Sequence, residues 1–204
     1  MNKIVLCIDN GDSGFEEIKQ YLVSRECRVY TLSERQDIRT LIERIDQDEG
    51  RLDLLILGAG GQIPEDGAIS EKHDCGMLLE LLCGQINRAQ EAVDAALPLL
   101  RRGEYKRIGM ITRKASSISY CKDDSNYGQH MVWAGLNMMG KLYFNLLRPE
   151  GFTFRWYCAE ERNGGMSAGE YLLSNLCYDA KEPYIHSDEN RLVMRDSYLR
   201  EVAW

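Results

Sequence analysis

The chain has 204 residues, a net charge of −7 and a pI near 5.1, and 44% of its residues are hydrophobic and 28% charged. These values describe a globular protein with one hydrophobic core, and the acidic balance argues against a phosphate-binding surface for nucleic acid. The N-terminus lacks the apolar region of a signal peptide, and no apolar run reaches membrane-spanning length, so we expect a cytoplasmic protein without a membrane segment. The seven cysteines form no Cys-x-x-Cys pair, which favours reduced thiols and no metal site.

Short apolar runs alternate with helical periodicity along the whole chain. Apolar runs predict strands at 3–8, 28–32, 52–57, 107–112 and 152–158. Helical spacing predicts helices at 15–24, from Ser33 to about 46, at 75–101, at 127–147 and at 167–177. A Ser33–Gln36 capping box is expected to open the second helix, and Pro98 to kink or divide the third. A hairpin over 184–194, turning at 188–190, is predicted to follow the last helix.

Strands separated by helices predict a doubly wound parallel sheet with helices on both faces. We therefore expect an α/β, Rossmann-like, three-layer domain that spans residues 1–204.

The segment 106–151 is the most informative part of the chain. It reads KRIGMITRKASSISY, then a polar stretch, then YGQHMVWAGLNMMGKLYFNLLRPEG. This segment resembles the core of the short-chain dehydrogenase/reductase family, and in particular its short bacterial C-factor-like branch. KIVLCIDNGDSGFEEI and LDLLILGAG resemble the cofactor-binding strands of the same family, and YIHSDENRLVMRDSYLREVAW resembles its C-terminal hairpin and final tryptophan. The resemblance implies a Rossmann-like fold and descent from NAD(P)-dependent oxidoreductases.

The cofactor-binding part departs from the family. Asn10 replaces the first glycine of the glycine-rich turn, Gly14 keeps the second, and Glu16 replaces the third. The other positions matched to the cofactor site are Glu34, where a ribose-binding acid could sit, and Gly58 and Gly60 after the third strand. Glu34 is interpreted instead as a first-turn residue beside the Ser33 cap.

Compared with the usual arrangement of the family, the sequence predicts one βα unit fewer. Only 47 positions separate Asn10 from Leu57, and they hold one helix, one strand and one helix. The expected strand order is therefore 2-1-3-4-5 with the hairpin beyond strand 5.

The catalytic residues of the family are missing from the matched positions. Arg113 falls where the family has its serine, and no tyrosine of the chain has a lysine four residues later. In one register of the helix, Gln129 takes the tyrosine position and Trp133 the lysine position. In the other register, Tyr127 is matched and Met131 takes the lysine position.

The family's catalytic set also includes an asparagine, and this residue is missing from its matched position as well. Gln85 falls at the asparagine position, with Asn87 two residues away.

Three functional hypotheses follow. The first is a non-catalytic binding or regulatory homologue that needs no cofactor, that forms a dimer through the 127–147 helix and that has a small-molecule or protein partner. The alternative is an atypical NAD(P)-dependent oxidoreductase that uses Tyr127 and His130, with Arg113 and Tyr120 nearby at the carboxyl ends of the strands. The third is an anion site at Arg113 and Lys114. Solvated polar residues in a relic cleft are the simpler interpretation of these side chains.

Overall fold

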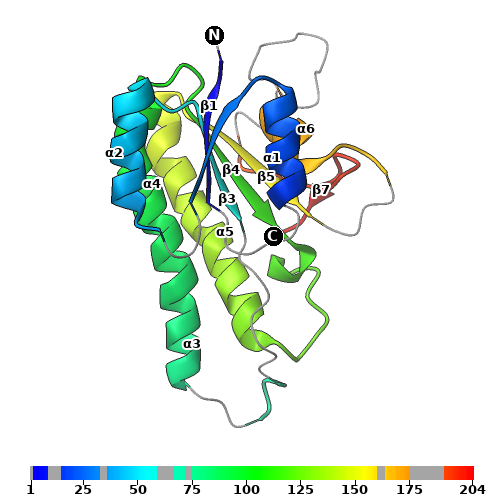
Figure 1. Cartoon of the computed structure of the whole chain (residues 1–204). Helices are drawn as coiled ribbons and strands as arrows, with labels where there is room; N and C mark the ends of the chain where they lie inside the picture. The colour runs from blue at the N-terminus through cyan, green and yellow to red at the C-terminus, as the bar shows by residue number, and fades with distance from the viewer. Residues whose placement is uncertain are drawn as a thin grey trace.

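The computed structural model describes residues 2–8, 15–32, 36–58, 67–71, 75–159, 164–174 and 191–204. Its centre is a seven-stranded sheet with the order β2-β1-β3-β4-β5-β6-β7 (Figure 1). The strands are β1 Ile4–Ile8, β2 Arg28–Leu32, β3 Leu54–Gly58, β4 Arg107–Thr112, β5 Thr153–Cys158, β6 Met194–Arg195 and β7 Glu201–Val202. The predicted order 2-1-3-4-5, with a hairpin beyond strand 5, is confirmed.

The central strands are buried on both faces. All residues of β1, β3 and β4 are buried, as expected for parallel strands covered by helices on each side. β6 adds a sixth parallel strand, and β7 pairs with it antiparallel. This hairpin turns after Arg195, later than the predicted one, whose turn at 188–190 lies outside the described residues.

Helices cover both faces of the sheet (Figure 1). One face carries α1 Phe15–Ser24 and α6 Ala168–Leu173, and the other carries α2 Ile38–Glu49, α4 Arg88–Arg102 and α5 Tyr127–Leu147. α3 Cys75–Leu82 leads into α4 through the π-helical segment Cys83–Asn87. None of the described helices is long and apolar enough to cross a membrane, and the described residues contain no cluster of three metal-binding side chains.

The predicted start of α2 was wrong, and Pro98 does not divide α4. α2 begins at Ile38, and its N-cap is Asp37, whose carboxylate accepts a hydrogen bond from the Thr40 backbone N–H at 2.9 Å. The Ser33–Gln36 capping box therefore does not open this helix, because the Asp37 carboxylate satisfies the first free N–H groups one turn later. α4 runs through Pro98 to Arg102, and the interruption of α-helical geometry lies earlier, in the π-helical segment.

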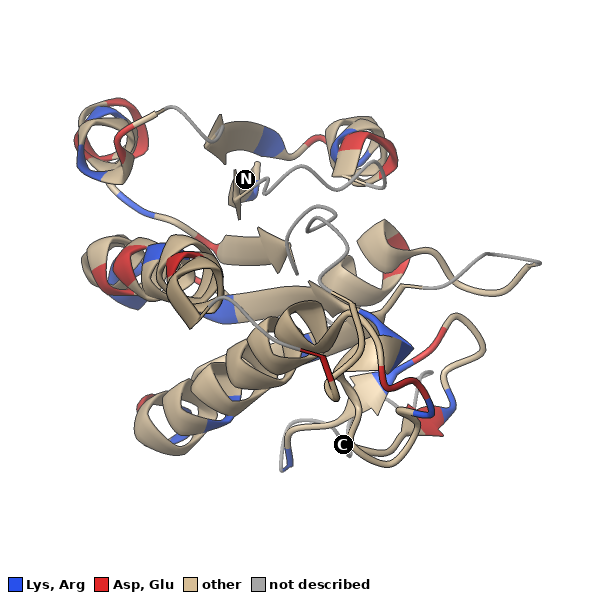
Figure 2. Ribbon diagram, turned by 90° about the horizontal axis from the view of Figure 1, so that it is seen from below, with Lys and Arg blue, Asp and Glu red and all other residues tan. Residues whose placement is uncertain are grey.

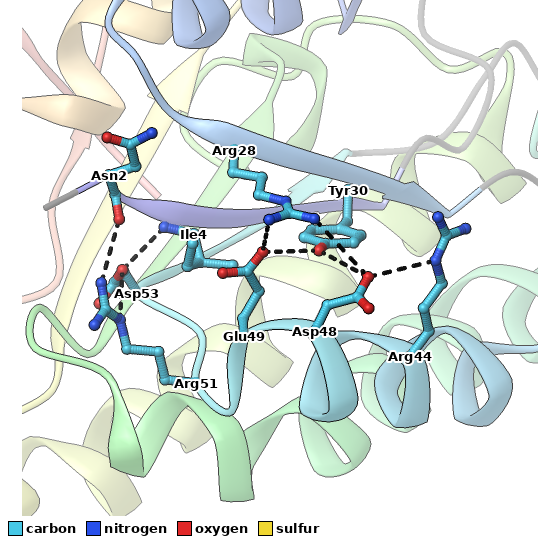
Figure 3. Close-up of polar contacts among 9 residues, drawn as sticks. All are labelled: Asn2, Ile4, Arg28, Tyr30, Arg44, Asp48, Glu49, Arg51 and Asp53. Carbon is cyan, nitrogen blue, oxygen red and sulfur yellow. Dashed lines mark hydrogen bonds and ion pairs between the residues drawn. The ribbon is translucent and has the colours of Figure 1, made fainter.

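A buried carboxylate ties together the amino ends of the central strands. Asp53 has no exposed surface and accepts hydrogen bonds from the backbone N–H of Ile4 at 2.9 Å and of Glu104 at 3.0 Å. The Nε of Arg51 lies 3.5 Å from the same carboxylate, and its guanidinium also donates to the Asn2 carbonyl (Figure 3). One side chain thus joins the start of β1, the entry to β3 and the turn between α4 and β4.

The edge strand β2 is joined to α2 by a second polar group. Arg28 pairs with Glu49 at 2.6 Å, and the hydroxyl of Tyr30 donates to the same carboxylate at 3.0 Å (Figure 3). Burial and the hydrogen bond to Glu49 raise the pKa of Tyr30 to about 12. The phenol therefore stays protonated as a donor at neutral pH and holds the edge of the sheet against the helix.

Replacement of Asp53 by alanine should destabilise the protein by about 3 kcal/mol, because two buried backbone N–H groups lose their acceptor. Asp48→Ala is the matched control, since its side chain is 37% exposed and its ion pairs are long; it should cost less than about 1 kcal/mol. Urea unfolding followed by circular dichroism measures both values. Equal losses in the two variants would contradict the structural role given to Asp53.

Candidate functional site

The candidate site lies where β4 ends and α5 begins. β4 stops at Thr112, and the chain continues through Arg113 into the 3₁₀ turn Lys114–Ser116. α5 then starts at Tyr127, after Asn126 in the left-handed conformation with φ of 51°. Carboxyl ends of parallel strands are the usual ligand-binding edge of this architecture.

Arg113 and Trp133 contact each other across this edge. The guanidinium carbon of Arg113 lies 5.9 Å from the centre of the Trp133 ring, which is the geometry of a cation–π contact. Trp133 is buried, whereas Met131 is 47% exposed. Trp133 therefore lies on the side of α5 that faces the end of β4, and both registers of the sequence match remain predictions.

Tyr127 and His130 lie on the first turn of α5, three residues apart. Tyr127 is buried, and the Nδ1 of His130 is 2.6 Å from the carbonyl oxygen of Ala115. A carbonyl can only accept, so the Nδ1 of His130 is the donor in this hydrogen bond. The same Nδ1 lies 3.9 Å from the sulfur of Cys121. Tyr120, the other predicted neighbour, has a side chain 47% exposed.

Thr112, Ser116 and Asn137 form a buried polar network that the sequence did not predict. The Ser116 hydroxyl donates to the Arg113 carbonyl at 2.6 Å, lies 2.9 Å from the Thr112 hydroxyl, and accepts from the amide of Asn137 at 2.8 Å. All three side chains are almost fully buried. The network fixes the turn after β4 against the middle of α5. Its sequence signal was Asn137, a polar residue between apolar neighbours in α5.

Gln85, matched to the family's asparagine, lies in the π-helical segment. Its Oε1 is buried and accepts no hydrogen bond from the described residues. The segment packs on α5 through Ile86, whose Cδ1 would be 2.6 Å from a Cβ at Gly135. Asn87, the alternative position, precedes α4 and makes no side-chain cap. π-helical turns are frequent near functional sites, and this one faces the α5 side of the candidate site.

Two of the predicted cofactor-turn positions are described. Glu16 is in the first turn of α1, its side chain is 65% exposed, and its carboxylate pairs with Lys19 at 2.6 Å. Gly58 ends β3, where an added Cβ would lie 2.7 Å from Cε2 of Phe15. The remaining positions lie outside the described residues; these are Asn10, Gly14, Glu34 and Gly60.

Comparison with solved structures identifies the fold. A putative short-chain alcohol dehydrogenase from Burkholderia multivorans matches with a TM-score of 0.71 and 16% identity over 100% of both chains. A carbonyl reductase from Pseudomonas aeruginosa PAO1 in complex with NADP matches with a TM-score of 0.73 and 14% identity over 99% of this chain and 100% of that one. This chain has the fold of the short-chain dehydrogenases/reductases. No family model and no curated protein matches the sequence.

Removal of the Ser116 hydroxyl should destabilise the protein by about 2 kcal/mol, because Ser116→Ala leaves the Asn137 amide and the Thr112 hydroxyl buried without their partner. Ser119→Ala is the control, since this hydroxyl bonds to a carbonyl at an exposed position. The test compares thermal and urea unfolding of both variants. A loss for Ser116→Ala no larger than that of the control would argue against a structural network.

Proposed function

We propose that this chain is a non-catalytic short-chain dehydrogenase/reductase homologue with a binding or regulatory role. The contact between Arg113 and Trp133 carries the proposal. In the register that matches Trp133 to the lysine, the positions of the serine and the lysine are in contact at 5.9 Å, and Gln129 takes the tyrosine position. An amide has no proton to transfer near neutral pH, so this set lacks a general acid.

The cofactor side supports the same conclusion. A helix N-terminus attracts a pyrophosphate through its free N–H groups and its dipole. Here the first turn of α1 carries the carboxylates of Glu16 and Glu17, which would repel the negative charge of a pyrophosphate. The charge of the first turn of α1 is therefore unfavourable for binding a dinucleotide.

Titration with NADH and NADPH tests the proposal directly. We expect no saturable binding up to millimolar concentration, measured by calorimetry and by nicotinamide fluorescence. The double variant Asn10→Gly/Glu16→Gly serves as the comparison, because regained binding would assign the loss to the turn. Saturable micromolar binding by the natural sequence would overturn the proposal.

An atypical oxidoreductase is the second candidate, and one observation favours it. Tyr127 and His130 share the first turn of α5, and the Nδ1 of His130 donates to the Ala115 carbonyl in the turn after β4. Structures with the same fold contain NADP. This candidate requires that Tyr127→Phe and His130→Ala each abolish a reductase rate on a panel of carbonyl compounds.

We also propose that the chain forms a dimer through α5. Four exposed apolar side chains follow one face of this helix at spacings of seven, four and four; they are Met131, Met138, Leu142 and Leu146, with exposed fractions of 47%, 61%, 62% and 61%. α5 contains one lysine and no carboxylate, and its ribbon is almost free of charge colours (Figure 2). A continuous apolar stripe of this kind is typical of a protein interface.

Leu142→Glu should convert the dimer to a monomer, because it places a charge in the middle of the stripe. Val23→Glu is the matched control, since Val23 is 61% exposed on α1 at the opposite face of the sheet. Light scattering after size exclusion measures the mass of each. A monomeric natural protein, or a dimer that survives Leu142→Glu, would contradict the α5 interface.

A further inference from the structure

A cavity of about 190 Å³ lies between α5, the turn after β4 and the C-terminal segment. Most of its lining is apolar, and the apolar walls are Ile118, Ala134, Met138, Leu192 and Trp204. The two neutral polar side chains in the lining, Ser116 and Asn137, are hydrogen-bonded to each other. The cavity therefore suits an apolar group that brings no hydrogen-bonding partner of its own.

Ile118 projects from the edge of this cavity. Its side chain is 84% exposed, the largest exposed fraction among the large apolar side chains that the structure describes. The residues on either side of it are fixed, because the Ser117 hydroxyl donates to the Ala203 carbonyl at 2.6 Å and the Ser119 hydroxyl donates to the Trp204 carbonyl at 2.8 Å. An apolar side chain on a fixed turn loses little conformational freedom when a partner covers it.

The cavity and the apolar stripe of α5 belong to one continuous surface. Met138 is a member of both, since it is 61% exposed on the helix and also lines the cavity. The stripe runs from Met131 to Leu146, so its middle falls at Met138. When two copies pair through antiparallel α5 helices, the twofold axis passes through the middle of the stripe. Each cavity then lies beside the axis and faces the second copy.

A contact with twofold symmetry requires a surface that complements itself, because both copies offer the same residues. A projecting isoleucine next to an apolar cavity meets this requirement. Among the described residues that line the cavity, Lys141 is the only charged side chain, and its Nζ lies 4.7 Å from the centre of the Phe144 ring. The centre of an interface is also where buried apolar anchors contribute most to affinity.

We propose that Ile118 of each copy occupies the cavity of the other copy in a symmetric α5 dimer. The inference rests on the proposed α5 dimer and adds the residue that each copy contributes to its partner. In the dimer, the Ile118 side chain leaves water and packs against Met138, Leu192 and Trp204. The volume of the cavity is sufficient, because an apolar cavity of about 150 Å³ holds a benzene molecule, which is larger than this side chain.

Two variants and their mixture test this contact. Ile118→Ser removes the projecting side chain, and Ala134→Leu fills the cavity from α5. Each variant alone should weaken the dimer about a hundredfold, because a symmetric dimer loses both copies of the contact. An equimolar mixture should regain dimer, since the Ala134→Leu chain keeps its isoleucine and the Ile118→Ser chain keeps its open cavity. Sedimentation equilibrium over a dilution series measures the three dissociation constants.

Ile69→Ser is the matched control, since Ile69 is 60% exposed and lies outside the cavity lining; it should leave the dissociation constant unchanged. Circular dichroism establishes that each variant is folded, and Ala134→Val replaces Ala134→Leu if the latter is unfolded. Fluorescence gives a second measurement. Of the three tryptophans, Trp133 and Trp156 are buried and Trp204 is 38% exposed, so dissociation of the natural dimer should shift the emission to longer wavelength.

The outcomes separate this inference from the α5 dimer itself. If Ile118→Ser dimerises like the natural protein, or if the mixture of the two variants regains no dimer, the Ile118 contact is wrong and the α5 dimer stands. Saturable binding of toluene by the intact dimer would show that the cavity is empty there, and would also overturn the contact. A natural protein that is monomeric at every concentration would remove both proposals.

Discussion

Helix α5 lies so close to the sheet that position 140 has room only for glycine. A Cβ on Gly140 would be 2.0 Å from the Trp156 ring, which is itself completely buried in β5. About one turn earlier in the same helix, the side-chain amide of Asn137 donates a hydrogen bond to the Ser116 hydroxyl. Close packing at Gly140 and the hydrogen bond from Asn137 to Ser116 together fix both the depth and the rotation of this helix.

The features that bear on function depend on that placement. The inner face of α5 brings Trp133 under Arg113, and its outer face exposes the apolar stripe from Met131 to Leu146. The cavity beside Trp204 lies between these two faces. A rotation of the helix by one residue would turn Trp133 away from β4 and bury part of the stripe, since successive residues differ by about 100° around the axis.

The sheet and its helical layers have the fold of short-chain dehydrogenases/reductases, and the compared structures are 14–16% identical to this chain. Identity at this level reflects packing constraints, which many sequences satisfy. Catalytic groups are subject to different constraints, and the end of β4 in this chain is occupied by the contact between Arg113 and Trp133.

The sequence alone determined the elements whose signal is local. Residues 107–112 and 127–147 were predicted with the bounds that the structure has, because an apolar run that forms a fully buried strand and a long helical periodicity can be recognised without tertiary context. The absence of a Tyr-x-x-x-Lys pair also follows directly from the sequence. Tertiary structure alone decided which groups meet. Arg113 and Trp133 are 20 positions apart and Ser117 and Ala203 are 86 apart, so no local pattern could pair them. Asp37 displaced Ser33 as the cap of α2 for a related reason: several residues could accept the first N–H groups, and the packing of the helix on the sheet determines where it starts.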